Sequence, residues 1–210
     1  MRDLILKMSI SIDGFVSDLD GRNTWMFGAD QETKAWVVET IWNASLHIMG
    51  SRSFRGMAAW WPTSTDQFAP PMNRIPKAVF SRRGLADLMN ADTVGGLDEA
   101  RARAGTTQSV ELQPGGESWA EAYVASGDLA EEIAKLKAHE GKPIIPHGGV
   151  SFARSLVAQG LVDQFALIVA PVALGEGLPL FSELAAPMRL KLVSSKAFPG
   201  GAVAQIYRSA

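Results

Sequence analysis

The stretch from Pro143 to Gln159 reads PIIPHGGVSFARSLVAQ and carries the strongest local evidence for the fold. Its first residues, up to Pro146, form a short apolar run that is typical of a buried strand. Gly148 and Gly149 follow, and then apolar residues recur at helical spacing until Gly160. A helix that begins directly after two glycines leaves backbone N–H groups free to bind an anion such as phosphate. The same two glycines also suit a plain tight turn, so the motif alone does not decide between these interpretations.

Strands and helices alternate on both sides of this stretch. The pattern predicts strands at 4–10, 46–49, 77–80, 122–124, 143–146 and 164–172, and helices at 31–44, 129–138 and 150–159. Two final strands, at 190–198 and 202–207, flank a Pro-Gly-Gly turn and predict an antiparallel hairpin. We therefore expect an α/β fold: a three-layer sandwich around a mixed, mainly parallel sheet of about eight strands.

The chain is expected to form a single domain over residues 1–210. A proline-rich loop is expected at 60–76. Residues 83–118 have no clear periodicity apart from a possible short helix at 97–104, and we interpret them as an insertion. The sequence shows no internal repeat.

Composition excludes several classes of protein. The 210 residues carry a net charge of −2 and have no basic stripe, so neither nucleic acid nor an anionic membrane is an expected partner. The absence of cysteine excludes disulfides, thiolate metal sites and a cysteine nucleophile. The sequence shows neither a signal peptide nor an apolar run of membrane-spanning length, and we expect a cytoplasmic protein.

Two further strand ends carry residues that suit phosphate. Gly50-Ser51-Arg52-Ser53 follows the strand at 46–49, and Ser81-Arg82 follows the strand at 77–80. Ligands of α/β proteins bind outside the carboxyl ends of the strands, and arginine binds phosphate through paired donors. Arginines also flank strands on many surfaces without binding anything, so it is the three strand ends together that predict a site.

Candidates for acid–base chemistry are few. Asp30 stands at the start of a predicted helix, where it is either a proton source or a simple N-cap. His47 lies in an apolar strand and is expected in the core, whereas His147 precedes the two glycines and is expected to line a site. No histidine has a partner at metal-ligand spacing, so no metal site is expected. Hydrolase and nucleotide-triphosphatase motifs are absent.

The order of these motifs resembles the dihydrofolate-reductase-like superfamily. It is most similar to the reductase domain of the bifunctional riboflavin-biosynthesis deaminase–reductase and its stand-alone relatives. The segments that carry the resemblance are MSISIDGF (8–15), IMGSRSF (48–54), VFSR (79–82), IIPHGG (144–149), GLVD (160–163), APVALGEG (170–177) and LF (180–181). No deaminase half with its zinc ligands is present.

The resemblance implies an NADPH-dependent reductase that acts on a pteridine- or pyrimidine-like heterocycle or a ribosylamino group. It places the cofactor at residues from four strand ends: Met8, Ser9, Gly50, Ser51, Arg52, Ser53, Ser81, Arg82, His147, Gly148, Gly149, Val150 and Ser151. Within that set, the pyrophosphate falls at residues 148–151 and the nicotinamide near residues 8 and 9. Asp30 corresponds to the acidic residue of folate reductases, and the loop after Asp13-Gly14 is expected to close over the nicotinamide.

One position departs from the family pattern, and several alternatives remain open. The family usually has arginine directly after the glycine of the second motif, whereas here Ser51 occupies that position and Arg52 follows it. Dihydrofolate is the alternative substrate, and a nucleotide-binding or dimerisation module without turnover is the alternative class of protein. By analogy with the family, the strand at 164–172 and the terminal hairpin predict a homodimer edge.

Overall fold

The computed structural model describes residues 1–83 and 107–209. Its central feature is a sheet built from two four-stranded parts. The first part has the strand order β5 (Tyr123–Ala125), β4 (Lys77–Phe80), β3 (Leu46–Gly50), β6 (Ile144–Pro146). The second has the order β1 (Ile5–Ser11), β7 (Gln164–Ala170), β10 (Val203–Ser209), β9 (Leu190–Ala197).

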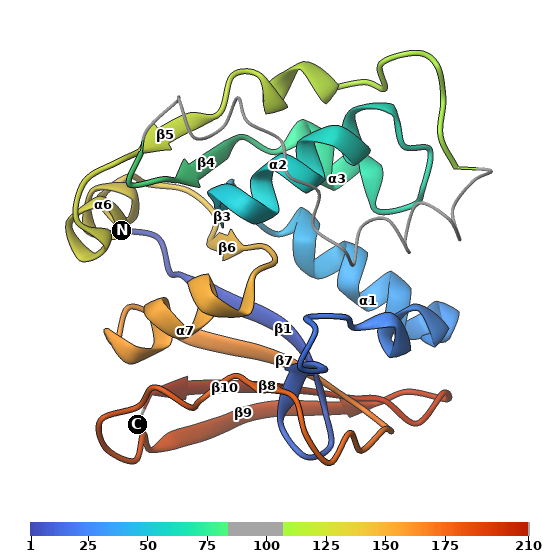
Figure 1. The fold of residues 1–210 in the computed structure, drawn as a ribbon, viewed down its shortest axis with the longest axis vertical. Coiled ribbons are helices and arrows are strands. Elements are labelled where there is room, and N and C mark those ends of the chain that lie inside the picture. Colours follow the sequence, from blue (N-terminus) through green and yellow to red (C-terminus); the bar gives the residue numbers. More distant parts are fainter. Residues whose placement is uncertain (84–106, 210) are drawn as a thin grey trace.

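The two parts are joined between β6 and β1. Leu4 and Ile144 form a parallel bridge, and the Ile144 N–H donates to the Asp3 carbonyl oxygen at 2.8 Å. All pairings from β5 to β7 are parallel, whereas β10 pairs antiparallel with both β7 and β9. The expected mixed, mainly parallel sheet with a terminal hairpin is therefore confirmed (Figure 1).

Helices cover both faces of this sheet, because buried strands alternate their side chains between two apolar layers. One layer holds α1 (Gln31–Trp42), α2 (Ser51–Trp60) and the short α3 (Ala69–Arg74), and includes Val37, Phe54 and Met72. The other holds α6 (Leu129–Ala138) and α7 (Val150–Ala158), and includes Ile133 and Leu156. In β3, Ile48 belongs to the layer of α6 and α7, and Met49 to the layer of α1. These are the three expected layers.

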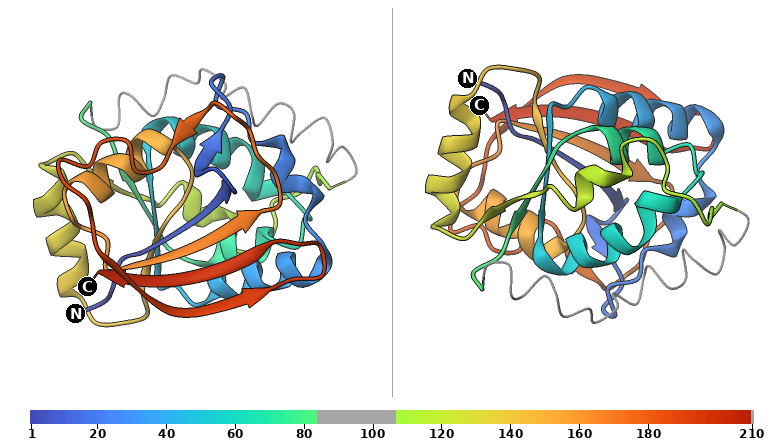
Figure 2. Two further views of the ribbon diagram at one scale, coloured as in Figure 1. Left: turned by 90° about the horizontal axis from the view of Figure 1, so that it is seen from below. Right: turned by 90° about the horizontal axis from the view of Figure 1, so that it is seen from above.

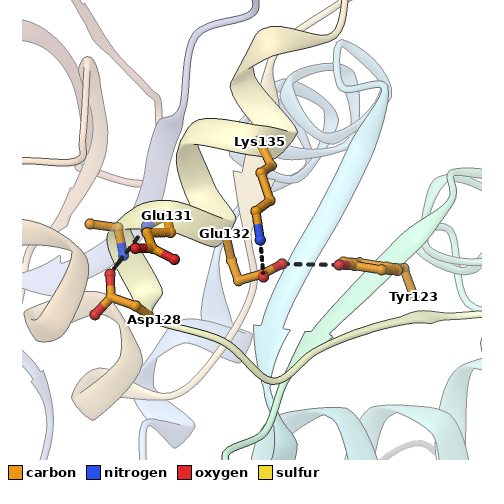
Figure 3. Close-up of polar contacts among 6 residues, drawn as sticks. Tyr123, Asp128, Glu131, Glu132 and Lys135 are labelled. Atoms are coloured by element: carbon orange, nitrogen blue, oxygen red, sulfur yellow. Dashed lines mark hydrogen bonds and ion pairs between the residues drawn. The ribbon is translucent and has the colours of Figure 1, made fainter.

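A polar cluster attaches α6 to the edge strand β5 (Figure 3). The nearly buried carboxylate of Glu132 accepts hydrogen bonds from the Tyr123 hydroxyl at 3.0 Å and from Lys135 Nζ at 2.8 Å. These bonds lower the pKa of Glu132, with the Lys135 bond contributing most. Asp128 caps the same helix by accepting from the Ala130 and Glu131 N–H groups.

Three expectations from the sequence are wrong, and a fourth concerns residues outside the described part of the chain. Residues 60–76 are not all loop: they contain the end of α2, the 3-10 turn η2 (Trp61–Thr63) and α3, whose prolines fall in the first turn, where no N–H is required. The strand β2 (Phe15–Ser17) lies in the expected loop after Gly14, and it pairs with β8 (Leu178–Pro179), a strand that was not predicted. The strand β7 lies between β1 and β10, so it is not an edge. The expected helix at 97–104 lies outside the described residues.

The described part of the insertion packs onto the α2–α3 connection. The Ser109 and Gln113 N–H groups donate to the Thr63 and Pro62 carbonyl oxygens at 2.8 and 2.7 Å. The 3-10 turn η3 (Gly116–Trp119) then places Trp119, which is 4% exposed, against Phe54 of α2. Residues 107–119 are therefore part of the packed fold.

Candidate cofactor and substrate site

The two glycine-containing strand ends lie side by side. Strands β3 and β6 are hydrogen-bonded neighbours, so the helices that follow them, α2 and α7, begin at the same edge of the sheet. Gly148 and Gly149 have φ values of +62° and +68°, in the region that glycine favours. A Cβ atom on Gly148 or Gly149 would lie 3.0 or 2.8 Å from the Ser53 Oγ atom of α2. The structure thus brings residues 148–149 against the first turn of α2.

The amino ends of these two helices are not capped by side chains. Helices α1 and α6 begin at Asp30 and Asp128, whose carboxylates accept first-turn N–H groups. Helices α2 and α7 begin instead at Gly50 and Gly149, which provide no side-chain acceptor. The first-turn N–H groups of α2 and α7 therefore keep their capacity to bind an anion, and the helix dipoles add positive potential at the same place. Val150 and Ser151 supply part of the first turn of α7.

The end of β4 reaches the same region through an aromatic contact. The rings of Phe80 and Phe152 lie 5.2 Å apart, which places the strand end beside the first turn of α7. Ser81 follows, with only 5% of its surface exposed, and its N–H donates to the Ala125 carbonyl oxygen. Arg52 and Arg82 are both exposed. Ser81 therefore lies on the buried side of the helix ends, and Arg52 and Arg82 lie on their solvent side.

Beneath the glycines lies a pair of buried histidines. The rings of His47 and His147 meet edge to face, with centroids 4.2 Å apart. Burial lowers the pKa of His47 to about 3, and burial followed by the charges of His47, Lys7 and Lys77 lowers the pKa of His147. Both rings are therefore neutral at pH 7. The expectation that His47 is a core residue is confirmed, because its side chain is fully buried.

Lys7 is the site residue that the sequence analysis missed. It lies in the middle of β1, immediately before Met8 and Ser9, and its charge influences His147. Removal of the side chain from water lowers its pKa to about 8. A lysine with this pKa exchanges protons near neutral pH and so is chemically available for acid–base work. The available signal was a single cation inside the apolar run from Leu4 to Ile10, which contradicts the pattern of a buried strand.

Alternation along β1 separates the residues that follow Lys7. Met8 is partly buried and packs against the apolar layer of α6 and α7. Ser9 shares the opposite face with Lys7 and is 8% exposed. Lys7 and Ser9 therefore belong to the face of α1 and α2, together with Ile5 and Ser11.

Asp30 is fully engaged as a helix cap. Its carboxylate accepts from the Glu32 and Thr33 N–H groups, from the Thr33 hydroxyl at 2.6 Å, and from the Gly200 N–H at 3.2 Å. These bonds lower its pKa, with the Thr33 hydroxyl contributing most, so the carboxylate form predominates at neutral pH. The capping role is thus confirmed. Its hydrogen bonds go to its own helix and to the hairpin turn, and none goes to either glycine junction.

Residues 1–83 and 107–209 contain no group of three or more histidine, cysteine, aspartate or glutamate side chains placed to hold a metal ion. Within the same residues, no helix is both long and apolar enough to cross a bilayer.

Sequence comparison identifies the class of protein that this fold and edge-of-sheet site define. The family described as "RibD C-terminal domain" matches residues 2–204, and the chain belongs to this family. The chain is 26% identical over 211 residues to the "Uncharacterized protein YyaP" of Bacillus subtilis (strain 168), covering 98% of this chain and 94% of that protein. It is 27% identical to the "Riboflavin biosynthesis protein RibD" of Corynebacterium ammoniagenes, covering 91% of this chain but only 49% of that longer protein.

Solved structures agree on the fold. A putative riboflavin biosynthesis protein from Shewanella sp. PV-4 matches with a TM-score of 0.64 at 18% identity, covering 100% of this chain and 99% of that one. The deaminase/reductase of Thermotoga maritima matches with a TM-score of 0.63 at 16% identity, covering 100% of this chain and 57% of that one. Dihydrofolate reductase from Enterococcus faecalis matches with a TM-score of 0.56 at 12% identity, covering 99% and 96%. The fold is therefore dihydrofolate-reductase-like.

Proposed function

We propose that this protein is an NADPH-dependent reductase of the riboflavin-biosynthesis type, acting on a pyrimidine- or pteridine-like heterocycle. The observation that carries the proposal is the pair of uncapped helix ends, α2 and α7, next to a lysine of lowered pKa. Membership of the RibD C-terminal family supports an oxidoreductase. The Enterococcus faecalis neighbour was solved in complex with NADP(H), which supports a dinucleotide in this fold.

The residues present fit a dinucleotide. The pyrophosphate would lie at residues 148–151, where two helix ends supply N–H donors and a side chain at either glycine would clash with Ser53. Arg52 and the segment Ser81-Arg82 would hold the phosphate on the adenosine side. The nicotinamide would lie near Met8 and Ser9, where the bound cofactor supplies the hydride.

Lys7 is the strongest candidate for a proton donor to the substrate. Its ammonium form is present at neutral pH, and its pKa of about 8 makes proton release easy. Asp30 remains the second candidate, but its carboxylate is ionised and already accepts four hydrogen bonds. The expected chemistry is reduction of a C=N or C=O carbon with a proton delivered from the side chain of Lys7 on β1.

A cofactor-binding experiment tests the proposed site. NADPH fluorescence is titrated with the wild type and with two variants, Gly149→Asp and Gly149→Asn. Aspartate and asparagine have the same size and both tolerate positive φ, so they differ only in charge. Repulsion between a carboxylate and the pyrophosphate is expected to raise the Kd of the Asp variant at least tenfold above that of the Asn variant, a difference of ~1.4 kcal/mol or more. Equal affinities would show that the pyrophosphate binds elsewhere.

Turnover separates an enzyme from a binding module. NADPH oxidation is followed by absorbance with a ribosylaminouracil and, in a parallel assay, with dihydrofolate. Oxidation with the first substrate supports the proposed function, and oxidation with the second alone supports the alternative folate activity. Saturable NADPH binding without oxidation of either would favour a nucleotide-binding module.

We also propose that the protein is a homodimer that associates through β9. This strand is the outer edge of the sheet (Figure 2). Nearly all of it is exposed, including Leu192 at 50% and Val193 at 55%. An unpaired strand edge presents free N–H and C=O groups that a second copy can pair. Light scattering at micromolar protein is expected to report twice the mass of one chain. The mass of one chain would refute the dimer.

A further inference from the structure

A cavity lies at the amino ends of the parallel strands, opposite the end where the glycine junctions lie. It has a volume of about 550 Å³ and lies between the carboxyl-terminal half of α1 and these strand ends. Ile5 and Gln164 line it, and they are the first residues of β1 and β7. The glycines of the cofactor site follow the carboxyl end of β6 instead. The volume falls within the range of about 300–1,000 Å³ that small-molecule sites occupy.

Apolar and polar side chains both line this cavity, here called the slot, and the polar ones are Glu39, Thr40, Asn43, Lys142 and Gln164. Its floor consists of small or aliphatic side chains from the adjacent strands β6, β1, β7 and β10: Ile145, Ile5, Ala166 and Ile206. Its opposite wall is α1, which contributes Trp36 and Trp42. Trp42 is 37% exposed, so part of its side chain is accessible to a ligand. A sheet face opposite indole rings suits a planar ring system, because aromatic rings bury a large apolar area by stacking.

The two charged groups of the slot are of opposite sign and form no ion pair with each other. Glu39 and Lys142 both line the cavity, yet neither forms a salt bridge or a side-chain hydrogen bond within residues 1–83 and 107–209. Glu39 lies near the carboxyl end of α1, whose partial negative charge also favours N–H donors. Lys142 can donate to a carbonyl oxygen. With one charge of each sign, the slot gives no advantage to a phosphorylated ligand.

We propose that this slot is a second binding site, specific for an uncharged planar nitrogen heterocycle that carries both N–H and carbonyl groups. Such a ligand stacks between the sheet and the indole rings, donates to Glu39 and accepts from Lys142. Because the slot and the glycine junctions lie at opposite ends of the strands, the heterocycle and NADPH bind at the same time.

The test uses lumichrome, an uncharged three-ring fluorescent heterocycle, with its fluorescence anisotropy as the readout. Saturable binding to the wild type is expected, and saturating NADPH is expected to leave the Kd unchanged. Glu39→Gln is expected to raise the Kd about tenfold, since a hydrogen bond to a charged acceptor becomes a neutral one. Trp42→Ala is expected to have an effect of similar size. The matched control is Glu32→Gln, an exposed carboxylate in the first turn of the same helix, which is expected to bind like the wild type.

Several results would overturn this second site. The first is absence of saturable lumichrome binding, and the second is displacement of lumichrome by NADPH. A third is an unchanged Kd in both Glu39→Gln and Trp42→Ala. A fourth is tighter binding of riboflavin phosphate than of lumichrome, which would contradict the charge argument. The Gly149→Asp variant separates this proposal from the proposed function, because it is expected to lose NADPH affinity and keep lumichrome affinity.

Discussion

Replacing Lys7 by methionine is expected to stabilise the protein in a pH-dependent way. Burial lowers the Lys7 pKa from 10.5 to about 8, so the folded state disfavours the ammonium form. Between these two pH values the unfolded chain binds more protons than the native protein, and the native protein therefore gains stability as pH rises. Methionine has a similar shape and no charge, so it removes this cost at every pH.

The size of the effect follows from the two pKa values. Linkage gives a cost of about 3.4 kcal/mol at pH 6.5 and about 1.4 kcal/mol at pH 9.5 for a shift of this size. Solvent that reaches the half-buried side chain reduces both values, so we expect Lys7→Met to gain about 2 kcal/mol at pH 6.5 and less than about 1 kcal/mol at pH 9.5. The wild type and the Lys7→Met variant both contain Lys77, so its titration contributes equally to their unfolding free energies and cancels from the difference between them.

Urea denaturation at the two pH values measures this difference. The matched control is Lys191→Met on the exposed strand β9, where the change in unfolding free energy is expected to stay within about 0.5 kcal/mol at both pH values. A Lys7→Met variant that is destabilised at pH 6.5, or whose gain does not shrink by pH 9.5, would refute the reasoning. Loss of NADPH oxidation in the stabilised variant would show that the lysine is retained for function at a cost in stability.

Three further outcomes are expected. Asp30→Asn keeps a capping oxygen and is expected to retain turnover within about threefold of the wild type. A decrease in turnover of 100-fold or more, with unchanged NADPH affinity, would instead establish Asp30 as the proton donor. Native His47, with its pKa of about 3, stays neutral between pH 7 and pH 5, whereas the unfolded chain binds a proton there, so the wild type loses about 2 kcal/mol of unfolding free energy over this range. His47→Leu is expected to remove this loss. Equal urea midpoints for the variant and the wild type across this range would contradict that. Arg52→Ala is expected to raise the Kd for NADPH about tenfold and that for NADH little, and an equal change for both would show that Arg52 does not select the 2′-phosphate.

Most of the fold could be predicted from local patterns. Apolar runs such as 46–49 and 77–80 are short, continuous and bounded by polar residues, and they became β3 and β4. Asp30 was predicted as either a cap or a proton source, and it does cap α1, because a carboxylate before an apolar periodic segment accepts the first N–H groups. These features depend on neighbours within a few residues.

The errors came from segments whose structure depends on distant partners. Strands β2 and β8 are two or three residues long and exist because they pair with each other across more than 160 positions. The strand β7 was predicted as a possible edge, since its apolar composition gives no information on which strands flank it. Lys7 was passed over because a single lysine inside an apolar run carries no periodic signal, and its role depends on what faces it.

The amino-acid sequence by itself determined the longer strands, the helices α1, α6 and α7 and the positions of the glycines, because apolar periodicity, caps and positive φ are local properties of the chain. Only the tertiary structure decided that residues 51–53 and 148–149 meet, that Lys7 and His147 lie within electrostatic reach of each other, and that Asp30 is occupied by the hairpin turn. The physical reason is that parallel pairing of β3 with β6 joins segments about 100 residues apart, and burial by those distant segments is what removes water from the site and shifts its pKa values.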